Sequence, residues 1–277
     1  MLRNLFIEIS DHYPKQKIMP VCLEFTNLPV YMRKHLFCLV LVGLLACQSG
    51  YHLTNRAAKR IGVDSLVATS DTGVANFLKP YRQKLDLTMN EVLAQSTGRI
   101  EKGLPDAPLN DLMTDAFLKQ ASQRYGKSID CSHMNYGGIR SNLPDGKITI
   151  GSVYEIMPFD NQLVVLTLTG DMLQQLLNHF AGGHGLVVGG VRVKLHDKQV
   201  QTVTFTNGRT LQPNETYTVV MSDYIANGGD NADFLKNALK HENLNYLMRD
   251  ALIDYFRQQG KTGQPINPTS DGRISIE

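Results

Sequence analysis

Apolar residues repeat at helical spacing in several separate stretches of the chain. The clearest case is residues 108–126, where leucine, methionine, alanine and phenylalanine recur every three or four positions. Pro108 suits the first turn of a helix and Gly126 its C-terminal cap. The same spacing predicts further helices over residues 72–85, with Pro80 as a kink or break, and over 151–159, 171–181, 232–239 and 243–260.

Strands are predicted between these helices, where β-branched and aromatic residues gather. The stretches are 90–100, 128–134, 161–170, 200–208 and 215–222, and a turned loop joins the last two. No internal repeat aligns along the chain. Because helices interleave with several neighbouring strands, the pattern predicts an α+β or mixed α/β domain rather than an all-β sandwich.

The N-terminal part has the order of a bacterial lipoprotein leader. From Met32 the chain reads "MRKHLFCLVLVGLLACQSG", which is a basic start, a short apolar run and a final cysteine, Cys47. The run is too short for a spanning helix, and its end, "LLAC", resembles a lipobox. The alternative is a short buried core helix. We expect a mis-called upstream extension at 1–31, a lipoprotein signal peptide at 32–46, a lipidated Cys47, a polar tether at 47–70 and one domain at 71–277. The expected location is the bacterial cell envelope, on its periplasmic side or at the outer membrane, through the lipid anchor.

Charge and cysteine content change once this leader is removed. The whole chain carries 28 Lys and Arg against 26 Asp and Glu, and residues 1–46 contain five of the basic and three of the acidic residues. The remaining chain therefore has no formal net charge, which removes the argument for a nucleic-acid polymer as partner. Cys131 becomes the only thiol besides Cys47. The domain cannot form an internal disulfide, so its stability must come from its core, and Cys131 itself fits a buried strand better than a nucleophile.

Two loops combine paired glycines with an amide and a charge. They are "NYGGIR", with Asn135 and Arg140, and "NGGD", with Asn227 and Asp230. Paired glycines let the backbone approach a ligand, while amide and charged side chains supply directional hydrogen bonds. Each loop alone is typical of a tight turn.

Two aromatic residues stand beside these loops in the sequence. Phe159 follows a proline, and Tyr224 precedes the second loop. Phe159 alone would be read as a core anchor. Together with the loops, the two rings predict a cleft that clamps a flat base.

The order of these blocks resembles the C-terminal domain of the 5'-nucleotidase / UDP-sugar hydrolase family. The matching stretches are "NYGGIRSNLPDGKITIGSVYEIMPF", "LVVGGVRV" and "YTVVMSDYIANGGDNADFL", within residues 88–260. The resemblance implies a single α+β domain of layered helices and mixed sheets that binds substrate. It implies that Asn135, Arg140 and Asp230 bind the nucleoside or sugar, together with the block that contains Asn227, and that Phe159 and Tyr224 stack on the base. Relatives often have phenylalanine in place of Tyr224.

One position departs from the family pattern. Relatives place a phosphate-contacting arginine shortly before the helix that begins near Pro108, and Leu104 stands about there in this chain. Lys102 or Arg99 is the available substitute.

The metal-binding half of the family has no counterpart in the sequence. Its D-x-H, G-N-H-[DE] and G-H-x-H blocks are missing, and "GDNAD" at 229–233 fits G-D-x-x-D only by overlapping the substrate block. The scattered histidines, among them His133, His179, His196 and His241, are read as structural or surface residues. We expect no catalytic residue and no metal ligand here, with divalent metals of the Mn, Zn, Mg or Ca class only in a partner chain.

The resulting hypothesis is a nucleoside- or nucleotide-recognition domain that serves nucleotide hydrolysis with a separate metallophosphoesterase chain. By resemblance it belongs with hydrolases of phosphoric monoesters, although it would be inactive alone. Two alternatives are a non-enzymatic nucleotide- or nucleoside-binding lipoprotein and a degenerate structural remnant.

Overall fold

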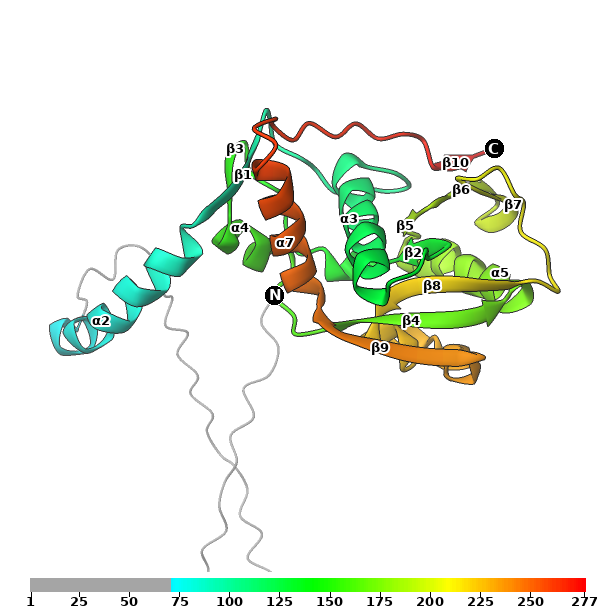
Figure 1. Ribbon diagram of the computed structural model, residues 1–277, viewed down its shortest axis with the longest axis horizontal. Helices are drawn as coiled ribbons and strands as arrows, with labels where there is room; N and C mark the ends of the chain where they lie inside the picture. The colour runs from blue at the N-terminus through cyan, green and yellow to red at the C-terminus, as the bar shows by residue number, and fades with distance from the viewer. Residues whose placement is uncertain (1–70) are drawn as a thin grey trace, which may run out of the picture. The chain divides into compact units, whose positions relative to one another are not determined.

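A computed structural model describes residues 71–277 of the chain, and Figure 1 shows their arrangement. The predicted extension at 1–31, the signal peptide at 32–46, Cys47 and the tether at 47–70 lie outside the described residues. Within the described part, no helix is both long and apolar enough to cross a bilayer.

A mixed five-stranded sheet forms the centre of the domain. Its order is β5-β2-β8-β4-β9, with β2 parallel to β8 and the other pairs antiparallel. The strands are β2 (Cys131–His133), β4 (Gln162–Thr169), β5 (Val188–Gly189), β8 (Thr216–Ser222) and β9 (Lys240–Leu247).

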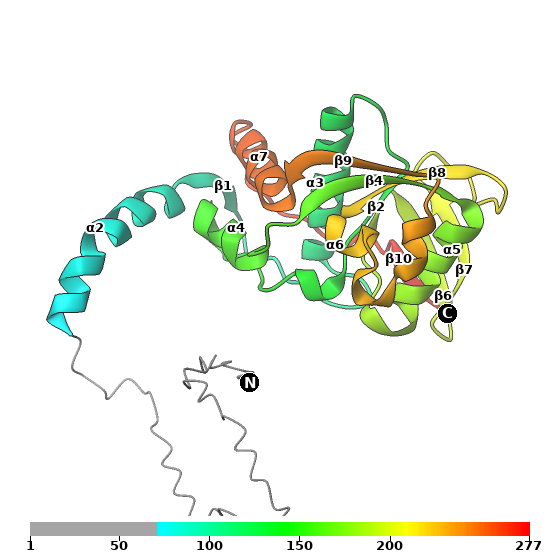
Figure 2. The ribbon, with the colours of Figure 1, turned by 90° about the horizontal axis from the view of Figure 1, so that it is seen from below.

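Both faces of this sheet are covered, so the domain has two apolar cores. Along β4, Leu163 and Val165 belong to one core, while Val164, Leu166 and Leu168 belong to the other, as the two-residue period of a strand requires. Helices α3 (Pro108–Tyr125) and α7 (Met248–Gly260) cover the first face. Helix α5 (Gly170–His179) and a three-stranded sheet cover the second, as Figure 2 shows.

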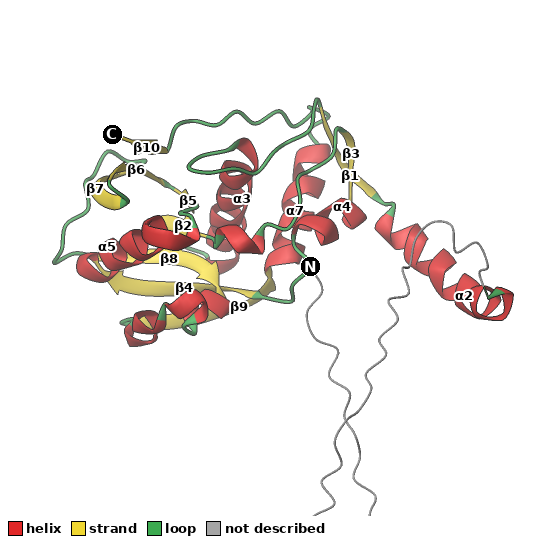
Figure 3. Ribbon diagram, turned by 180° about the vertical axis from the view of Figure 1, so that it is seen from behind, coloured by secondary structure: helices red, strands yellow, loops and turns green. Residues whose placement is uncertain are grey.

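Smaller elements complete the domain. The three-stranded sheet has the order β10-β6-β7, and a two-stranded sheet pairs β1 with β3. Their bounds are β1 (Val92–Ser96), β3 (Gly146–Thr149), β6 (Val191–His196), β7 (Gln199–Phe205) and β10 (Ile274–Ile276). The remaining helices are α2 (Thr72–Met89), α4 (Ile150–Ile156) and α6 (Asp223–Ala226), with 3-10 turns η1 (Tyr136–Gly138), η3 (Gly229–Asn231) and η4 (Asp233–Asn237) and a π-helical turn η2 (Phe180–His184). Figure 3 separates helices from strands by colour.

The α+β class and most of the predicted elements are confirmed, including the helix at 108–126. The prediction of helix over 243–247 is wrong, because these residues belong to β9. Asn243 pairs with Val164 and Leu247 with Gln162 of β4, while half-buried Leu244 and Tyr246 alternate with exposed neighbours. The sequence alone is also compatible with a helical face.

Other elements were shifted or missed by the sequence pattern. Within the predicted helix at 232–239 the structure has only the short 3-10 turn η4, and β3, β5, β6 and β10 were not predicted. Helix α2 continues through Pro80 to Met89, past its predicted end at residue 85.

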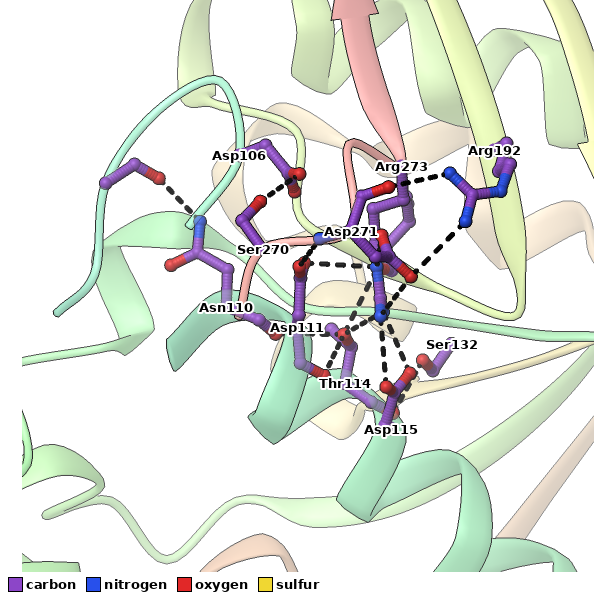
Figure 4. Close-up of polar contacts among 12 residues, drawn as sticks. Asp106, Asn110, Asp111, Thr114, Asp115, Ser132, Arg192, Ser270, Asp271 and Arg273 are labelled. Carbon is purple, nitrogen blue, oxygen red and sulfur yellow. Dashed lines mark hydrogen bonds and ion pairs between the residues drawn. The ribbon is translucent and has the colours of Figure 1, made fainter. Parts of the chain in front are cut away.

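A buried arginine fastens the C-terminal segment to α3. Arg273 lies 3.1 Å from Asp111 and 2.8 Å from Asp115, and its own side chain is 8% exposed. It also binds Asp271, which Arg192 contacts from the outside at 3.7 Å. Figure 4 shows these groups converging on one guanidinium. The cluster holds β10 against β6 and so fixes the three-stranded sheet relative to α3.

The protonation of Asp111 depends on this cluster. Burial raises the pKa of Asp111 to about 7, and the neighbouring Asp106 carboxyl adds to the rise while Arg273 opposes it. Above about pH 7, therefore, the folded protein holds Asp111 as a buried carboxylate that depends on Arg273 for its charge partner.

We predict that Arg273→Met destabilises the domain at pH 8. The substitution leaves Asp111 and Asp115 without their partner, and breaking a buried ion pair costs about 3–5 kcal/mol of unfolding free energy. Arg192→Met is the matched control, since this exposed arginine shares the Asp271 partner and its removal should cost about 1 kcal/mol or less. Urea unfolding measures both, and equal losses in the two variants would contradict the role given to Arg273.

Candidate functional site

The candidate site lies at one edge of the central sheet, where several strands end together. β2 and β8 run parallel, and β9 runs in the same direction because both β8 and β9 are antiparallel to β4. The residues that follow these three strands therefore meet the residue that precedes β4. They are Met134 and Asn135 after β2, Tyr224 two positions after β8, Met248 after β9 and Asn161 before β4.

A cleft of about 480 Å³ opens at this edge. Five of the six predicted binding residues line it: Asn135, Arg140, Phe159, Tyr224 and Asp230. The other lining residues are Met134, Gly137, Gly138, Met157, Asn161, His184, Ser222 and Met248. Residues that are far apart in the sequence are thus gathered around one cavity.

Asn227 is the predicted residue that the structure leaves outside the cleft. Its side chain is exposed, and its backbone N–H donates to the Asp223 carbonyl at 3.0 Å to end α6. In this structure it shapes the loop before Asp230 rather than lining the cavity.

The two predicted aromatic residues lie open to the cleft. The exposed fraction is 39% for Phe159 and 47% for Tyr224. This argues against the core-anchor reading of Phe159, because a core phenylalanine is buried. Exposed rings on opposite segments of one cavity are suited to stacking against a planar ligand.

The loop that carries Phe159 is held by a residue that the sequence analysis did not single out. Arg249, whose side chain is 8% exposed, donates to the Phe159 carbonyl at 3.1 Å and pairs with Asp160 at 2.6 Å. Its guanidinium also lies 4.2 Å from the centroid of Tyr154. Arg249 therefore fixes the backbone from which Phe159 projects, and only the tertiary contact reveals it.

The first glycine loop presents an amide and a cation. Arg140 donates its backbone N–H to the Ile156 carbonyl at 2.9 Å, and its guanidinium lies 5.9 Å from the centroid of Phe159. A Cβ on Gly138 would come within 2.9 Å of the Asn135 amide oxygen, so a larger residue here would displace the Asn135 side chain. Among the described residues, no carboxylate pairs with Arg140 and no hydrogen bond engages the Asn135 side chain. The Arg140 guanidinium donates one hydrogen bond, to the Gly137 carbonyl at 3.1 Å. Its other donors and the Asn135 side chain are available to a ligand.

Several cleft residues lie outside the two glycine loops. Asn161 donates to the Asp223 carboxylate at 2.9 Å, and the Ser222 hydroxyl caps α6 by accepting from Ile225 N–H at 3.2 Å. His184 reaches the cavity from the π-helical turn after α5. No local motif marks these positions, because each enters the cleft through strand pairing or a helix end.

Of the four histidines that the sequence analysis interpreted as structural or surface residues, one is buried, two are exposed and one contacts the second glycine loop. Burial lowers the pKa of His133 to about 4, and its ring packs 4.2 Å from the centroid of Phe180 in the core. His196 and His241 are exposed. His179 supports the second loop by lying 2.8 Å from the Asp230 carbonyl.

Leu104, which stands where the family resemblance predicts a phosphate-contacting arginine, does not line the cleft, and neither does Lys102 or Arg99. Leu104 lies against Gly185 and lines a separate cavity of about 400 Å³. Arg99 is exposed and pairs with Glu101 at 3.7 Å. Lys102 donates to the Ile139 carbonyl at 2.5 Å, and its pKa is lowered by burial and by the charge of Arg140. Of the two suggested substitutes, Lys102 is the one whose charge interacts with that of a cleft residue, Arg140.

Possible metal ligands and nucleophiles lie elsewhere. In the described part of the chain, Asp106, Asp111 and Asp271 form a carboxylate group whose oxygens lie within 4.8 Å of one another. The Arg273 guanidinium pairs with two of them and takes the place that a cation would need. Cys131 is buried in β2, and burial raises the pKa of its thiol far above the usual range, as expected for an unreactive cysteine.

Comparison with known proteins gives a consistent family. The family described as "5'-nucleotidase, C-terminal domain" matches residues 88–237. The 5'-nucleotidase precursor of Thermus thermophilus superposes with a TM-score of 0.65 at 27% identity, over 74% of this chain and 43% of that one.

Curated relatives agree at similar identity. The apyrase of Tabanus yao is 27% identical over 72% of this chain and 40% of its own length, and the 5'-nucleotidase of Vibrio vulnificus is 24% identical over 73% and 37%. The chain thus spans less than half the length of these relatives. On the family match and the shared fold, this chain belongs to the 5'-nucleotidase C-terminal domain family.

Proposed function

We propose that this domain recognises a nucleoside or nucleotide and contributes to nucleotide hydrolysis together with a separate metallophosphoesterase chain. The observation that carries the proposal is the set of groups that one cleft leaves open to a ligand. Phe159 and Tyr224 offer exposed rings to a base. The Asn135 side chain and Oδ2 of Asp230, which have no hydrogen-bond partner among the described residues, offer hydrogen bonds to a base or sugar. A cleft built only for stability would bury or pair these groups.

The end of the cleft near Arg140 suits the phosphate. Arg140 has no carboxylate partner among the described residues, and Lys102 feels its charge. Two neighbouring cations without a counter-ion repel each other, and a phosphate would relieve that repulsion. The base then lies between the rings, with the phosphate directed past Arg140 toward the partner chain.

The hydrolytic step belongs to that partner in this proposal. Relatives are more than twice as long as the matched region, and a two-metal site of the kind the family carries supplies the attacking hydroxide. This domain contributes by holding the nucleoside so that the phosphate projects from the cleft at a fixed distance and angle.

Helix α2 offers a surface to which a partner can bind. None of its side chains is buried, and six large apolar residues on it are more than 40% exposed: Val74, Phe77, Leu78, Tyr81, Leu85 and Leu87. Figure 1 shows the helix standing clear of the body of the described domain. Contiguous exposed apolar surface of this kind is typical of an interaction site, which supports a partner chain.

Export and lipid anchoring are part of the same proposal. The basic start, apolar run and "LLAC" ending support lipidation at Cys47, which would place the domain on the periplasmic side of the cell envelope or at the outer membrane. The non-enzymatic alternative, a lipoprotein that captures nucleosides, uses the same cleft and anchor without a catalytic partner.

We predict that Phe159→Ala weakens adenosine binding to the full chain by about 5- to 150-fold, because stacking of a base on an aromatic ring contributes about 1–3 kcal/mol. Phe77→Ala is the matched control, since it removes an equally open ring from α2, outside the cleft. Isothermal titration calorimetry measures both. Unchanged affinity in the Phe159 variant would favour the degenerate remnant and reject the cleft as a base-binding site.

Complementation tests the catalytic role. The full chain, mixed with a metallophosphoesterase chain encoded beside its gene and supplied with Mn²⁺, is expected to hydrolyse AMP, whereas the chain alone is not. Arg140→Ala should lower the rate of the mixture. If the mixture is no faster than the partner alone while adenosine still binds tightly, the capture lipoprotein replaces the catalytic proposal.

Labelling with a fatty acid tests lipidation at Cys47. Cells fed a labelled fatty acid should label the full chain through Cys47, and Cys47→Ser should lose both the label and the membrane association. Cys38→Ser, within the apolar run, is the control and should retain both. Label that persists in the Cys47 variant would exclude this anchor.

A further inference from the structure

The hydroxyl of Tyr224 closes the second glycine loop on itself. It donates to Oδ1 of Asp230 at 2.9 Å, and it accepts from the Asp230 backbone N–H at 3.2 Å. A phenolic hydroxyl can do both at once, since it has one proton and two lone pairs. The two bonds join residues six positions apart and form a clasp, the Tyr224–Asp230 clasp, at the wall of the cleft.

The backbone inside this clasp takes conformations that need support. Asp230 has φ 52° and Asn231 φ 64°, in the left-handed region that is unfavourable for a residue with a Cβ. Such conformations persist where surrounding contacts fix them, which is common at binding sites.

Gly229 lets the tyrosine ring lie against this turn. A Cβ on Gly229 would fall 2.6 Å from two ring carbons of Tyr224, so any larger residue would push the ring away. The hydroxyl reaches Asp230 because the ring rests on the glycine backbone.

The His179 side chain also holds the backbone of Asp230. The Asp230 carbonyl accepts a hydrogen bond from Nε2 of His179 at 2.8 Å, which requires the proton on that nitrogen. The His179 ring stacks on His184 with centroids 5.1 Å apart, and His184 lines the cleft. Asp230 is therefore held at its N–H, its carbonyl and one carboxylate oxygen.

The other carboxylate oxygen, Oδ2, has no hydrogen-bond partner within residues 71–277. A carboxylate accepts hydrogen bonds through both oxygens, so Oδ2 remains free to accept from a hydroxyl donor. A fixed acceptor binds such a donor more tightly than one that must first be ordered.

We propose that the Tyr224 hydroxyl is a positioning group, separate from the stacking role of its ring. It orders the Asp230 carboxylate for a ligand that carries hydroxyl donors, of which the ribose of a nucleoside is the class that fits the cleft. The inference rests on the proposed nucleoside site. Phenylalanine at this position would keep the ring but lose the clasp.

Amide exchange tests the clasp without any ligand. In the full chain, Tyr224→Phe removes the acceptor of the Asp230 N–H, so hydrogen exchange at this amide should become about tenfold faster, as expected when a hydrogen bond of about 1.4 kcal/mol is lost. Tyr81→Phe is the control, since it removes the hydroxyl of an exposed tyrosine on α2. Unchanged exchange at Asp230 would overturn the inference.

Ligand selectivity tests the positioning role. Tyr224→Phe should weaken adenosine binding about fivefold to tenfold, while the affinity for 2',3'-dideoxyadenosine, which lacks both sugar hydroxyls, should stay within about twofold. A purely structural effect would weaken both ligands equally and overturn the proposal. Tighter adenosine binding would also overturn it, by showing that the hydroxyl competes with the ligand for Asp230.

The two measurements separate the two proposals. If the unaltered chain binds neither ligand, the nucleoside site fails and the positioning role fails with it, whatever the exchange rate shows about the clasp. If adenosine binds but selectivity does not change in Tyr224→Phe, the nucleoside site stands and only the positioning role is lost.

Discussion

The hydrogen-bonded pairing of β2, β8, β4 and β9 is the constraint on which the rest of the domain depends. It sets three strand ends and one strand start at the same edge of the sheet. Because β4 and β8 carry buried apolar residues on both faces, a slip of one residue would exchange the two cores, so the register of these strands is strongly fixed. The cleft inherits its precision from that register, since its lining residues follow the strand ends directly.

Two glycines and two buried arginines position the loops and segments that surround the sheet. Gly138 and Gly229 each stand where a Cβ would collide with a cleft side chain, Asn135 or Tyr224, so the glycine pairs matter for close packing as well as for turning. Two buried arginines fasten the surrounding segments: Arg249 the loop of Phe159, and Arg273 the C-terminal strand. Arg249 thus fixes the backbone that carries one wall of the cleft, and a binding site needs its ligand-contacting groups on fixed backbone.

The chain belongs to the 5'-nucleotidase C-terminal domain family, and its relatives are more than twice as long as the region they share with it. The described domain contains the candidate cleft. The two departures expected from the family resemblance lie at different places. Leu104, where the resemblance predicts an arginine, lines another cavity, whereas Tyr224, where it predicts phenylalanine, lines the cleft and adds a hydroxyl.

The sequence by itself determined the α+β class, the helix at 108–125, the strand β4, and five of the residues that line the cleft. These follow from periodicity and from short motifs, which are local properties of the chain. Only the tertiary structure decided that residues 243–247 form an edge strand, that His184 and Asn161 enter the cleft, and that Arg249 and Arg273 hold distant segments. Only the tertiary structure shows the Tyr224–Asp230 clasp, because the sequence of this loop alone predicts no more than a turn. The physical reason is that pairing partners, burial and hydrogen-bond geometry depend on groups brought together by folding, and no local pattern encodes which groups those are.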